Sequence, residues 1–245
     1  LKNLYFRYAK NADDVLRGLN LEIEEGKLHC LLGGNGSGKS TTLKAICEII
    51  KPQSGKVKIA DNCRAAMVPQ NPQALFTEIS CEEEVLEGMC YQKLEIEEKV
   101  QRTEEMLKLM EIEHLRKANP YDLSGGEQQR LALAKVMVSN PDILLLDEPT
   151  KGLDPFFKQT LGRILRSLWK ENKTIFMVSH DIEFCAEFGD RCSMFFDGEI
   201  ATSGSAKEFF SGNNFYTTVE NKLTRKWCEG IITGEEARTW IRSLL

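Results

Sequence analysis

The sequence predicts an α/β protein with a mixed, mostly parallel sheet, an antiparallel β part at its N-terminus and an inserted helical segment. Three observations lead to this prediction. Apolar runs of strand length recur within residues 1–72 and again within 140–205. Helical segments separate the later runs, and such alternation is typical of a parallel sheet covered by helices. Residues 73–139 instead have helical periodicity without a convincing strand, which indicates an insertion.

The first part of the chain is expected to contain mostly strands. Apolar and polar residues alternate from the first residue, and they do so again at Leu19, Leu21 and Ile23. A continuous apolar run then leads into a glycine-rich turn, which predicts a buried strand followed by a helix that ends before Pro52. The expected elements are strands at 1–8, 19–23, 28–32, 56–60 and 65–68 and a helix at 39–48.

The rest of the chain is expected to form helices first and then to return to strands. The pair Asp154-Pro155 suits the N-cap and first position of a helix, and Asp197-Gly198 predicts a hairpin. We expect a core at 1–72 and 140–205, a helical insertion at 73–139 and a polar helical tail at 206–245. The expected helices are 82–90, 95–110, 125–139 and 155–170, and the expected strands are 143–147, 174–178 and 192–196.

The composition excludes some classes of function. The chain of 245 residues has a formal net charge of −5 and a pI near 5.5. A domain that binds duplex nucleic acid usually has a basic bias, so we expect no nucleic acid partner. No apolar run approaches the roughly 18–20 residues needed to span a bilayer. If a membrane is involved, another chain must supply the spanning part.

The cysteines do not form a metal-binding pattern. The eight cysteines include no Cys-x-x-Cys pair, and only three histidines accompany them. This argues against a zinc site or a disulfide framework and fits a reducing cytosol. The chain begins within an apparent strand and without an initiator Met, so we expect a fragment of a longer polypeptide.

Residues 33–40 read GGNGSGKS and fit the phosphate-binding loop G-x-x-x-x-G-K-[ST]. Glycines let backbone N–H groups surround a β-phosphate, and the following helix directs its positive end at the same anion. We expect Lys39 to contact the β- and γ-phosphates, Ser40 to bind Mg²⁺ and Thr41 to contact the α-phosphate. Alone, the loop does not separate ATPases from GTPases or kinases. The nucleotide-binding candidates in it are Asn35, Gly36, Ser37, Gly38, Lys39, Ser40 and Thr41.

An acidic pair follows the apolar run at 143–146. Asp147, at the carboxyl end of the expected strand, can hold Mg²⁺ through water as the acidic partner of a phosphate-binding loop. Glu148 follows where the strand emerges, and a carboxylate there can align and polarise an attacking water. A general base of this kind contributes typically ~10²–10⁴ in rate. The prediction of hydrolysis, rather than of binding alone, rests mainly on Glu148.

Residues 123–130 read LSGGEQQR and closely resemble the signature motif of ATP-binding cassette (ABC) ATPases. Ser124 and Glu127 form a capping-box pattern, and Gly125 and Gly126 leave N–H groups accessible at a helix N-terminus, which suits an anion. Each glycine costs about 1 kcal/mol of helix propensity, and close approach of a ligand is one reason for that cost. Glu127 stands where the family often has Gln, a change that alters hydrogen bonding to Ser124.

The resemblance covers residues 1 to about 205 and implies a P-loop NTPase (RecA-like) core that hydrolyses ATP with Mg²⁺. In the family, the signature of one subunit closes over the γ-phosphate bound by its partner. A second ABC cassette, in a homo- or heterodimer, is therefore an expected partner. Such a shared site explains why this chain has two anion-seeking loops but one phosphate-binding loop.

Four further residues match motifs of the family in the same order. Tyr8 is similar to the aromatic residue that stacks on adenine, with Phe6 as the rival. Gln70 is similar to the Q-loop glutamine, which would sense Mg²⁺ and the attacking water. Asp154 ends a GLD triplet that resembles the D-loop bridging two subunits, and it also suits an N-cap.

His180 resembles the switch histidine, which would contact the γ-phosphate and orient Glu148. His29 and His114 fit no such pattern. The resemblance thus implies three groups of residues. The catalytic candidates are Glu148, His180 and Gln70, the Mg²⁺ ligands are Ser40, Gln70 and Asp147, and nucleotide contacts outside the phosphate-binding loop are Tyr8, Ser124, Gly125, Gly126 and Asp154.

A narrower resemblance lies around Gln70. Residues 70–72 (QNP), 75–76 (LF) and 82–85 (EEEV) resemble the energy-coupling-factor importers of vitamins or transition-metal ions. The tail segment that begins at Phe215 (FYTT) resembles duplicated two-cassette members of that group. We therefore expect one cassette of a two-cassette protein at the cytoplasmic face of the cell membrane. A transmembrane coupling subunit would grip the groove near Gln70.

Two other classes of function remain as alternatives. A soluble ABC ATPase can act on ribosomes or nucleic acid. The chromosome type is excluded because Lys39 and Ser124 lie only about 85 positions apart, too close for its long coiled coil. The ribosome type usually has basic linkers, which this acidic chain lacks. A small-molecule kinase is the third class, and the signature, Glu148 and His180 argue against it.

Overall fold

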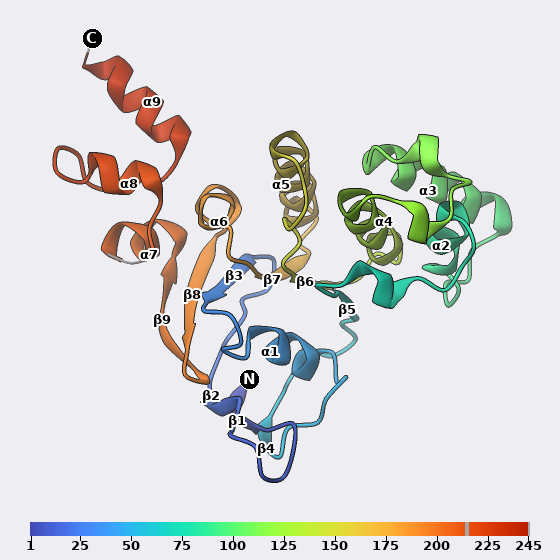
Figure 1. The fold of residues 1–245 in the computed structure, drawn as a ribbon, viewed down its shortest axis with the longest axis horizontal. Helices are drawn as coiled ribbons and strands as arrows, with labels where there is room; N and C mark the ends of the chain where they lie inside the picture. Colours follow the sequence, from blue (N-terminus) through green and yellow to red (C-terminus); the bar gives the residue numbers. More distant parts are fainter. Residues whose placement is uncertain (214–215, 245) are drawn as a thin grey trace.

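The larger of two sheets organises the chain in the computed structural model, which describes residues 1–213 and 216–244 (Figure 1). Its strand order is β5-β6-β7-β3-β8-β9. The first five of these strands are parallel, and β9 pairs antiparallel with β8. The mostly parallel sheet expected from the sequence is therefore confirmed. The strands are β3 (Leu28–Gly33), β5 (Ala65–Val68), β6 (Ile143–Asp147), β7 (Thr174–Val178), β8 (Arg191–Phe196) and β9 (Glu199–Ser205).

Helices cover both faces of this sheet because successive strand residues point to opposite sides. On one face, α1 (Lys39–Ile46) packs in a core with Leu31 and Phe176. On the other face, α5 (Pro155–Lys170) and α6 (Ile182–Phe188) share a core with Leu144. The parallel arrangement brings the carboxyl ends of β3, β5, β6 and β7 to one edge, where ligands bind in open α/β sheets.

The smaller sheet is antiparallel, with the order β2-β1-β4, and packs on the same face as α1. It contains β1 (Lys2–Phe6), β2 (Leu16–Leu19) and β4 (Ser54–Lys56). Its buried residues include Leu4, Leu16 and Leu19. The expected antiparallel N-terminal part is thus present.

Two strand predictions in this region are wrong. The segments expected as strands at 19–23 and 56–60 have no strand structure beyond Leu19 and Lys56. Leu1 and Leu21 exchange backbone hydrogen bonds of 2.8 and 3.2 Å, but the central strand β1 begins only at Lys2. No described strand is therefore available to pair with the residues that follow Leu21.

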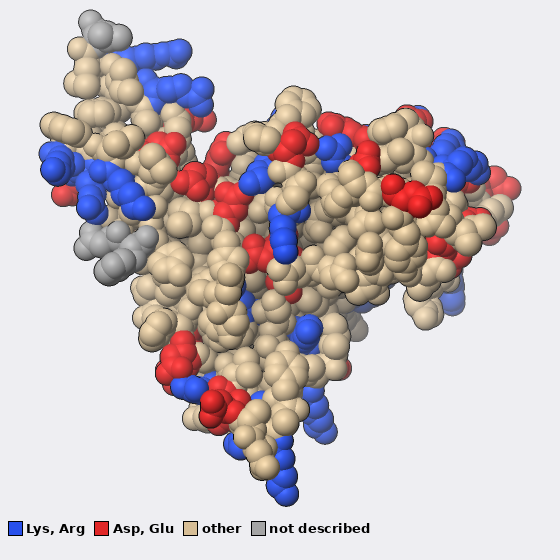
Figure 2. Space-filling model, in the orientation of Figure 1, with Lys and Arg blue, Asp and Glu red and all other residues tan. Residues whose placement is uncertain are grey.

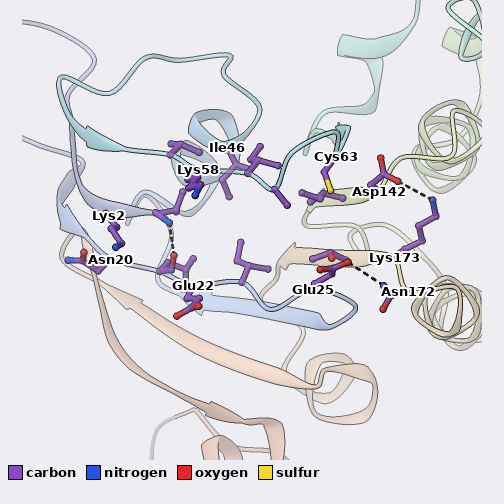
Figure 3. Close-up of a pocket in the computed structure, with 18 of the residues that line it drawn as sticks. Lys2, Asn20, Glu22, Glu25, Ile46, Lys58, Cys63, Asp142, Asn172 and Lys173 are labelled. Atoms are coloured by element: carbon purple, nitrogen blue, oxygen red, sulfur yellow. Dashed lines mark hydrogen bonds and ion pairs between the residues drawn. The ribbon is translucent and has the colours of Figure 1, made fainter.

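The apolar side chains of these two segments line a cavity instead (Figure 3). Ile23 and Ile59 take part in it, together with Ile46 at the end of α1. The cavity has a volume of about 860 Å³ and reaches the starts of β6 and β7. It therefore lies at the amino ends of the parallel strands, opposite the edge at which their carboxyl ends meet.

The residues between β5 and β6 are helical, as expected, and lie to the right in Figure 1. Ser80 is the N-cap of the first of these helices, because its hydroxyl accepts a hydrogen bond from Glu83 N. The helices are α2 (Cys81–Glu87), α3 (Ile96–Leu109) and α4 (Gly125–Met137), with 3₁₀ turns η1 (Pro72–Leu75), η2 (Glu113–Leu115) and η3 (Pro120–Asp122).

The described residues of the tail form three helices, and they are not polar throughout. The helices are α7 (Ala206–Gly212), α8 (Val219–Thr224) and α9 (Gly234–Ser243). Phe209 and Phe210 of α7 are buried in the main core, Thr217 donates a hydrogen bond to Phe210 O, and Thr218 is buried as well. Phe215, on which part of the narrower resemblance depends, lies outside the described residues. Within residues 1–213 and 216–244, no helix is both long and apolar enough to cross a membrane.

Candidate active site

The loop between β3 and α1 faces open space. In the described structure, a Cβ atom added at Gly34 or Gly36 would meet nothing within 4 Å. Gly38 caps α1 at φ 117°, and no side chain of the described residues satisfies the first turn of this helix. The Ser37 hydroxyl is buried and has no hydrogen-bond partner among the described residues. The loop therefore offers donors to an acceptor outside the chain.

The Lys39 ammonium group lies across this loop. Its Nζ donates hydrogen bonds to Gly33 O at 2.9 Å and to Gly34 O at 2.7 Å. It also lies 3.4 Å from Nε2 of His180. Burial lowers the pKa of Lys39, while the charges of Glu148 and Asp147 oppose that shift. The loop thus holds a cation directly in front of its own glycines.

The Ser40 hydroxyl and the Asp147 carboxylate meet at the carboxyl edge of the sheet. Ser40 Oγ donates to Asp147 Oδ1 at 3.0 Å. Asp147 is buried at the end of β6, and this burial raises its carboxyl pKa, although the hydrogen bond from Ser40 opposes the shift. Mg²⁺ prefers oxygen ligands, and this hydroxyl and this carboxylate place two oxygens close together.

Glu148 is held in a strained backbone conformation beside this pair. Its φ of 54° lies in the left-handed region, which costs a non-glycine residue of order 1–3 kcal/mol. Its N–H donates to Val178 O at 2.9 Å, so the end of β6 is fixed to β7. Burial raises the pKa of the Glu148 carboxyl above its ordinary value, while the His180 N–H and Lys39 oppose this.

His180 holds the Glu148 carboxylate from two sides. Its backbone N–H donates to Oε2 at 3.1 Å, and its Nε2 lies 3.2 Å from Oε1. Burial lowers the pKa of His180, and the Lys39 charge lowers it further, so the ring is neutral near pH 7. A neutral ring has one N–H, so Nε2 either donates to Glu148 or accepts from Lys39.

Gln70 stands at the same edge of the sheet. Strand β5 pairs in parallel with β6, and Val68 lies opposite Leu146 in the register. Gln70 is exposed and follows Val68 by two residues, just as Glu148 follows Leu146 by two residues. The topology therefore brings Gln70, Asp147 and Glu148 to neighbouring positions at one edge.

Tyr8 lies beside the start of α1. Its hydroxyl is 3.0 Å from Thr41 Oγ1, and its ring packs edge-on against Phe6 with centroids 4.9 Å apart. The Tyr8 side chain is 59% exposed, whereas Phe6 is only 7% exposed. Of the two aromatic candidates, only Tyr8 has a face available to a planar ligand.

The N-terminus of α4 is capped by its own residues. Ser124 Oγ accepts from Glu127 N, and the Glu127 carboxylate accepts from both Ser124 N at 2.8 Å and Ser124 Oγ at 2.6 Å. A Cβ added at Gly125 would meet nothing within 4 Å of the described atoms. At Gly126 it would lie 2.9 Å from Gly152 O. Only the second glycine is therefore required by packing within the chain.

Arg130 joins α4 to the segment before α5, a role that the sequence did not reveal. Its guanidinium contacts Asp154 at 3.0 Å and Glu111 at 3.5 Å, and it lies 3.9 Å from the Phe157 ring centroid. Asp154 also caps α5, as expected, by accepting from Phe157 N at 3.0 Å. No local sequence pattern pairs positions 130 and 154, so only the tertiary fold could reveal this contact.

The cavity in front of Ser124 is separate from the phosphate-binding loop. It measures about 530 Å³ and includes His114, to which the sequence assigned no role. Neither Lys39 nor Glu148 belongs to it, so the described chain presents two anion-seeking sites rather than one closed site. Its lining residues are Glu111, His114, Ser124, Gly125, Gly126, Glu127, Arg130, Gly152 and Asp154.

Comparison with known families and proteins finds one consistent group. The family described as ABC transporter matches residues 16–151. A putative ABC transporter ATP-binding protein of Bacillus cereus is 42% identical over 96% of this chain and 44% of its own length. The chain therefore spans less than half of that relative. The energy-coupling factor transporter ATP-binding protein EcfA of Methanocaldococcus jannaschii is 33% identical over 86% of this chain and 80% of its own length.

Solved structures show the same likeness. A dimeric ATP-binding cassette in a post-hydrolysis state, bound to ADP and Pi, aligns with a TM-score of 0.77 and 30% identity. The alignment covers 84% of this chain and 97% of that one. CbiO1 from Clostridium perfringens, described as part of the ABC transporter complex cbiONQ, aligns with a TM-score of 0.76 and 31% identity. That alignment covers 92% of this chain and 94% of the other.

Proposed function

The chain belongs to the ABC transporter family of ATP-binding domains, and we propose that it hydrolyses MgATP in a head-to-tail dimer to power a membrane transporter. It is an ABC ATPase cassette with the P-loop fold. Because the chain covers only 44% of the length of the Bacillus relative, the coupling of its ATPase to transport is part of this proposal.

The observation that carries this proposal is the arrangement of Glu148, His180 and Lys39. His180 contacts both oxygens of the Glu148 carboxylate, and Lys39 Nζ lies 3.4 Å from the same Nε2 atom of His180 that faces Glu148 Oε1. In the proposed reaction, water attacks the γ-phosphorus, and the Glu148 carboxylate takes the proton from that water. The bond to the leaving oxygen of ADP breaks, and Lys39 and the loop N–H groups stabilise the charge on the phosphates.

The magnesium site of this proposal consists of Ser40 and Asp147, with Gln70 as a further oxygen ligand. Mg²⁺ prefers six oxygen ligands and usually keeps several waters, so two protein oxygens that already lie 3.0 Å apart suit it. When bound, the ion supplies positive charge to the β- and γ-phosphate oxygens. Burial of the Asp147 carboxylate, which raises its pKa, is a cost that a bound cation would offset.

A second cassette completes the site in this proposal. The open cavity at Ser124 and the open space in front of Gly34 and Gly36 lie in different parts of one chain. In a head-to-tail dimer, the Ser124 end of α4 on one chain faces the nucleotide held by Lys39 on the other. The likeness to a dimeric cassette bound to ADP and Pi supports this arrangement.

The transporter that we propose is an energy-coupling-factor importer of vitamins or metal ions. Relatives named for that system support the assignment, and so does CbiO1, a part of the complex cbiONQ. The chain would act at the cytoplasmic face of the membrane, bound to a transmembrane coupling subunit near Gln70. The other half of the polypeptide would supply the second cassette.

The alternative, a soluble ABC ATPase acting on ribosomes or nucleic acid, has less support. The chain has 37 acidic and 32 basic residues. On the face drawn in Figure 2, acidic and basic side chains form separate small groups between broad uncharged areas; the basic ones gather most at the tail, at the upper left, and form no single stripe across the face. Copurification of the intact protein with membranes, rather than with ribosomes, distinguishes the two functions.

Phosphate release by the full-length protein and its Glu148→Gln variant tests the proposal. We expect the variant to bind MgATP as the wild type does but to release phosphate at least about a hundredfold more slowly, because its amide cannot take the proton. Glu199→Gln, an exposed carboxylate on β9, is the matched control and keeps wild-type turnover. Unchanged phosphate release by Glu148→Gln would overturn the assignment.

A further inference from the structure

The segment that carries Gln70 away from β5 is fixed to α4 at its beginning. Asn71 caps the turn η1, and Gln73 Nε2 donates to Gln128 Oε1 at 3.3 Å. Farther along, the Tyr121 hydroxyl donates to Phe76 O at 3.3 Å. The first contact places Gln73 against α4, and the second joins Phe76 to the turn η3 that precedes α4.

A wholly buried carboxylate fixes the next part of the segment. Glu84 of α2 is 0% exposed. Its Oε1 accepts from the backbone N–H groups of Thr77 at 2.5 Å and Glu78 at 2.6 Å. Its Oε2 accepts from Lys135 Nζ at 2.5 Å. One side chain therefore joins the segment that follows Gln70 to α4.

Lys135 completes the connection from the other side. Its Nζ also donates to Leu75 O at 2.7 Å and contacts Glu87 Oε2 at 3.0 Å. Burial lowers the pKa of Lys135, but the hydrogen bonds to Glu84 and Glu87 outweigh it, so the pKa lies above its ordinary value. Lys135 thus keeps its positive charge, and the two side chains together satisfy three backbone groups of residues 75–78.

Stability alone is a weak reason for such a pair. The desolvation of two buried charges often cancels their attraction, and well-packed apolar residues of similar volume are frequently as stable. What apolar residues cannot do is hold the carbonyl of Leu75 and the N–H groups of Thr77 and Glu78 in fixed positions. We therefore interpret the pair as a device that holds residues 75–78 in place.

The helix that carries Lys135 also carries Ser124 at its N-terminus. Ser124 and Lys135 are 11 positions apart, or about 16 Å along the helix. A helix transmits a displacement along this distance as a rigid rod. Any movement of Ser124 onto a neighbouring cassette therefore moves Lys135, and with it the segment that begins at Gln70.

We propose that Glu84 and Lys135 are positioning residues that couple α4 to the Gln70 segment, so that closure at Ser124 sets the position of Gln70 for hydrolysis. This proposal rests on the proposed function and adds a route by which one nucleotide site senses engagement of the signature. A displacement of about 1 Å at a reacting group can cost about a hundredfold in rate, so a loose tether is expected to lower turnover.

The test replaces both charges by apolar residues of similar size, Glu84→Leu with Lys135→Met, in the full-length protein. Hydrogen exchange is measured at the Thr77 and Glu78 amides. We expect their protection to fall at least tenfold, while amides in the middle of α4 keep theirs. The matched control is Glu98→Leu with Arg102→Met, an exposed ion pair on α3 that does not contact the segment, and it leaves this exchange unchanged.

Kinetics of the same variants separate positioning from folding. We expect the Glu84→Leu/Lys135→Met variant to bind MgATP within twofold of wild type, because the phosphate-binding loop is untouched, while its kcat falls at least tenfold. The single variant Lys135→Arg, which keeps the charge and the donors, is expected to retain most of the kcat. If the double variant does not fold, the near-isosteric Glu84→Gln is measured in its place, with at least a threefold fall in kcat expected.

A folded double variant with wild-type kcat, or with unchanged exchange at Thr77 and Glu78, would overturn the proposal. Failure of this proposal can be distinguished from failure of the proposed function. If the wild-type protein binds nucleotide but releases no phosphate, the proposed function fails. The exchange measurement then still decides whether Glu84 and Lys135 tether the segment.

Discussion

The two helices that begin with glycine-rich anion loops differ in how their N-termini are satisfied. At α1, Gly38 offers no side-chain cap, and Ser37 Oγ is buried with no partner among the described residues. At α4, Ser124 and Glu127 form a complete capping box. Among the described residues, the first site has no side-chain acceptor for these donors, whereas the second already contains the Glu127 carboxylate where an incoming anion would bind.

This difference suggests different tasks for the two sites. The N-terminus of α1 gains its acceptors only when a phosphate binds, which favours tight binding by one chain alone. At α4, a phosphate from a neighbouring cassette must compete with the Glu127 carboxylate for the Ser124 donors. The signature is therefore expected to engage late, after the nucleotide is already bound elsewhere.

The largest effect that tests this contrast is expected from Ser124→Arg. A long side chain fills the cavity in front of α4 and prevents a second cassette from closing, so hydrolysis falls by about a hundredfold or more, as it does when transition-state donors are lost elsewhere. Binding of MgATP to the Lys39 site stays within twofold. Phosphate release and equilibrium binding are measured on the same preparation.

The matched control for this substitution is Ser139→Arg, at the other end of α4. Ser139 lies two residues beyond the last residue of α4, so the substitution adds the same charge and volume outside the Ser124 cavity, and turnover is expected to stay near that of the wild type. A Ser124→Arg protein that dimerises with ATP and hydrolyses it normally would contradict the shared site.

A smaller effect is expected at Tyr8, on the phosphate-binding side. Stacking of a base on an aromatic ring is worth about 1–3 kcal/mol. Tyr8→Leu should therefore weaken ATP binding about tenfold, while Tyr8→Phe, which loses only the hydroxyl near Thr41, changes it little. Titration with a fluorescent ATP analogue measures both. Equal affinities for all three proteins would remove Tyr8 from the nucleotide site.

A more modest effect is expected in the pH dependence of kcat/KM and of Tm, and its sign follows from the pKa of Glu148. Burial raises the pKa of Glu148 above 4.5, so kcat/KM should fall on the acid side at a pH above that value as the base gains a proton. A raised carboxyl pKa also means that the ionised group destabilises the fold above that pKa, and the effect is lost below it. Glu148→Gln should therefore raise Tm relative to wild type more at pH 7 than at pH 4. An equal difference at both pH values would contradict the shift.

The smallest expected effect is on the free energy of unfolding, and it differs between alanine substitutions at the two signature glycines. Ala at Gly125 meets open space and should raise the free energy of unfolding by up to about 1 kcal/mol through helix propensity. Ala at Gly126 approaches Gly152 O at 2.9 Å and should lower it. Thermal or urea unfolding of the two variants measures the difference. Equal stabilities would show that the contact with Gly152 has no energetic consequence.

Much of the fold was predictable, because continuous apolar runs of strand length that alternate with helical segments have few interpretations other than a parallel sheet. The strand at 143–147 and the helix at 155–170 occur with the predicted bounds. The strands expected at 19–23 and 56–60 failed for a tertiary reason, since an alternating pattern forms a strand only where a neighbour offers hydrogen bonds. Helix α6 was not predicted. It has only seven residues and begins at Ile182, directly after the His180 motif, so it is too short to give a clear helical pattern.

The site was predictable where chemistry fixes local spacing. The phosphate-binding loop, the acidic pair and the capping box at Ser124 are contiguous patterns, and the structure forms each of them. Contacts between distant positions were not predictable, as with Arg130 and Asp154 or Glu84 and Lys135. Their residues are ordinary charged side chains in sequence, and only the fold reveals which pairs are buried together.

Calorimetric titration of MgATP into wild type, Lys39→Ala and Ser124→Arg tests the central claim most directly. We expect wild type and Ser124→Arg to bind one nucleotide per chain with the same affinity, and Lys39→Ala to bind at least about a hundredfold more weakly. Binding by Lys39→Ala with wild-type affinity would contradict the account, and so would loss of binding in Ser124→Arg.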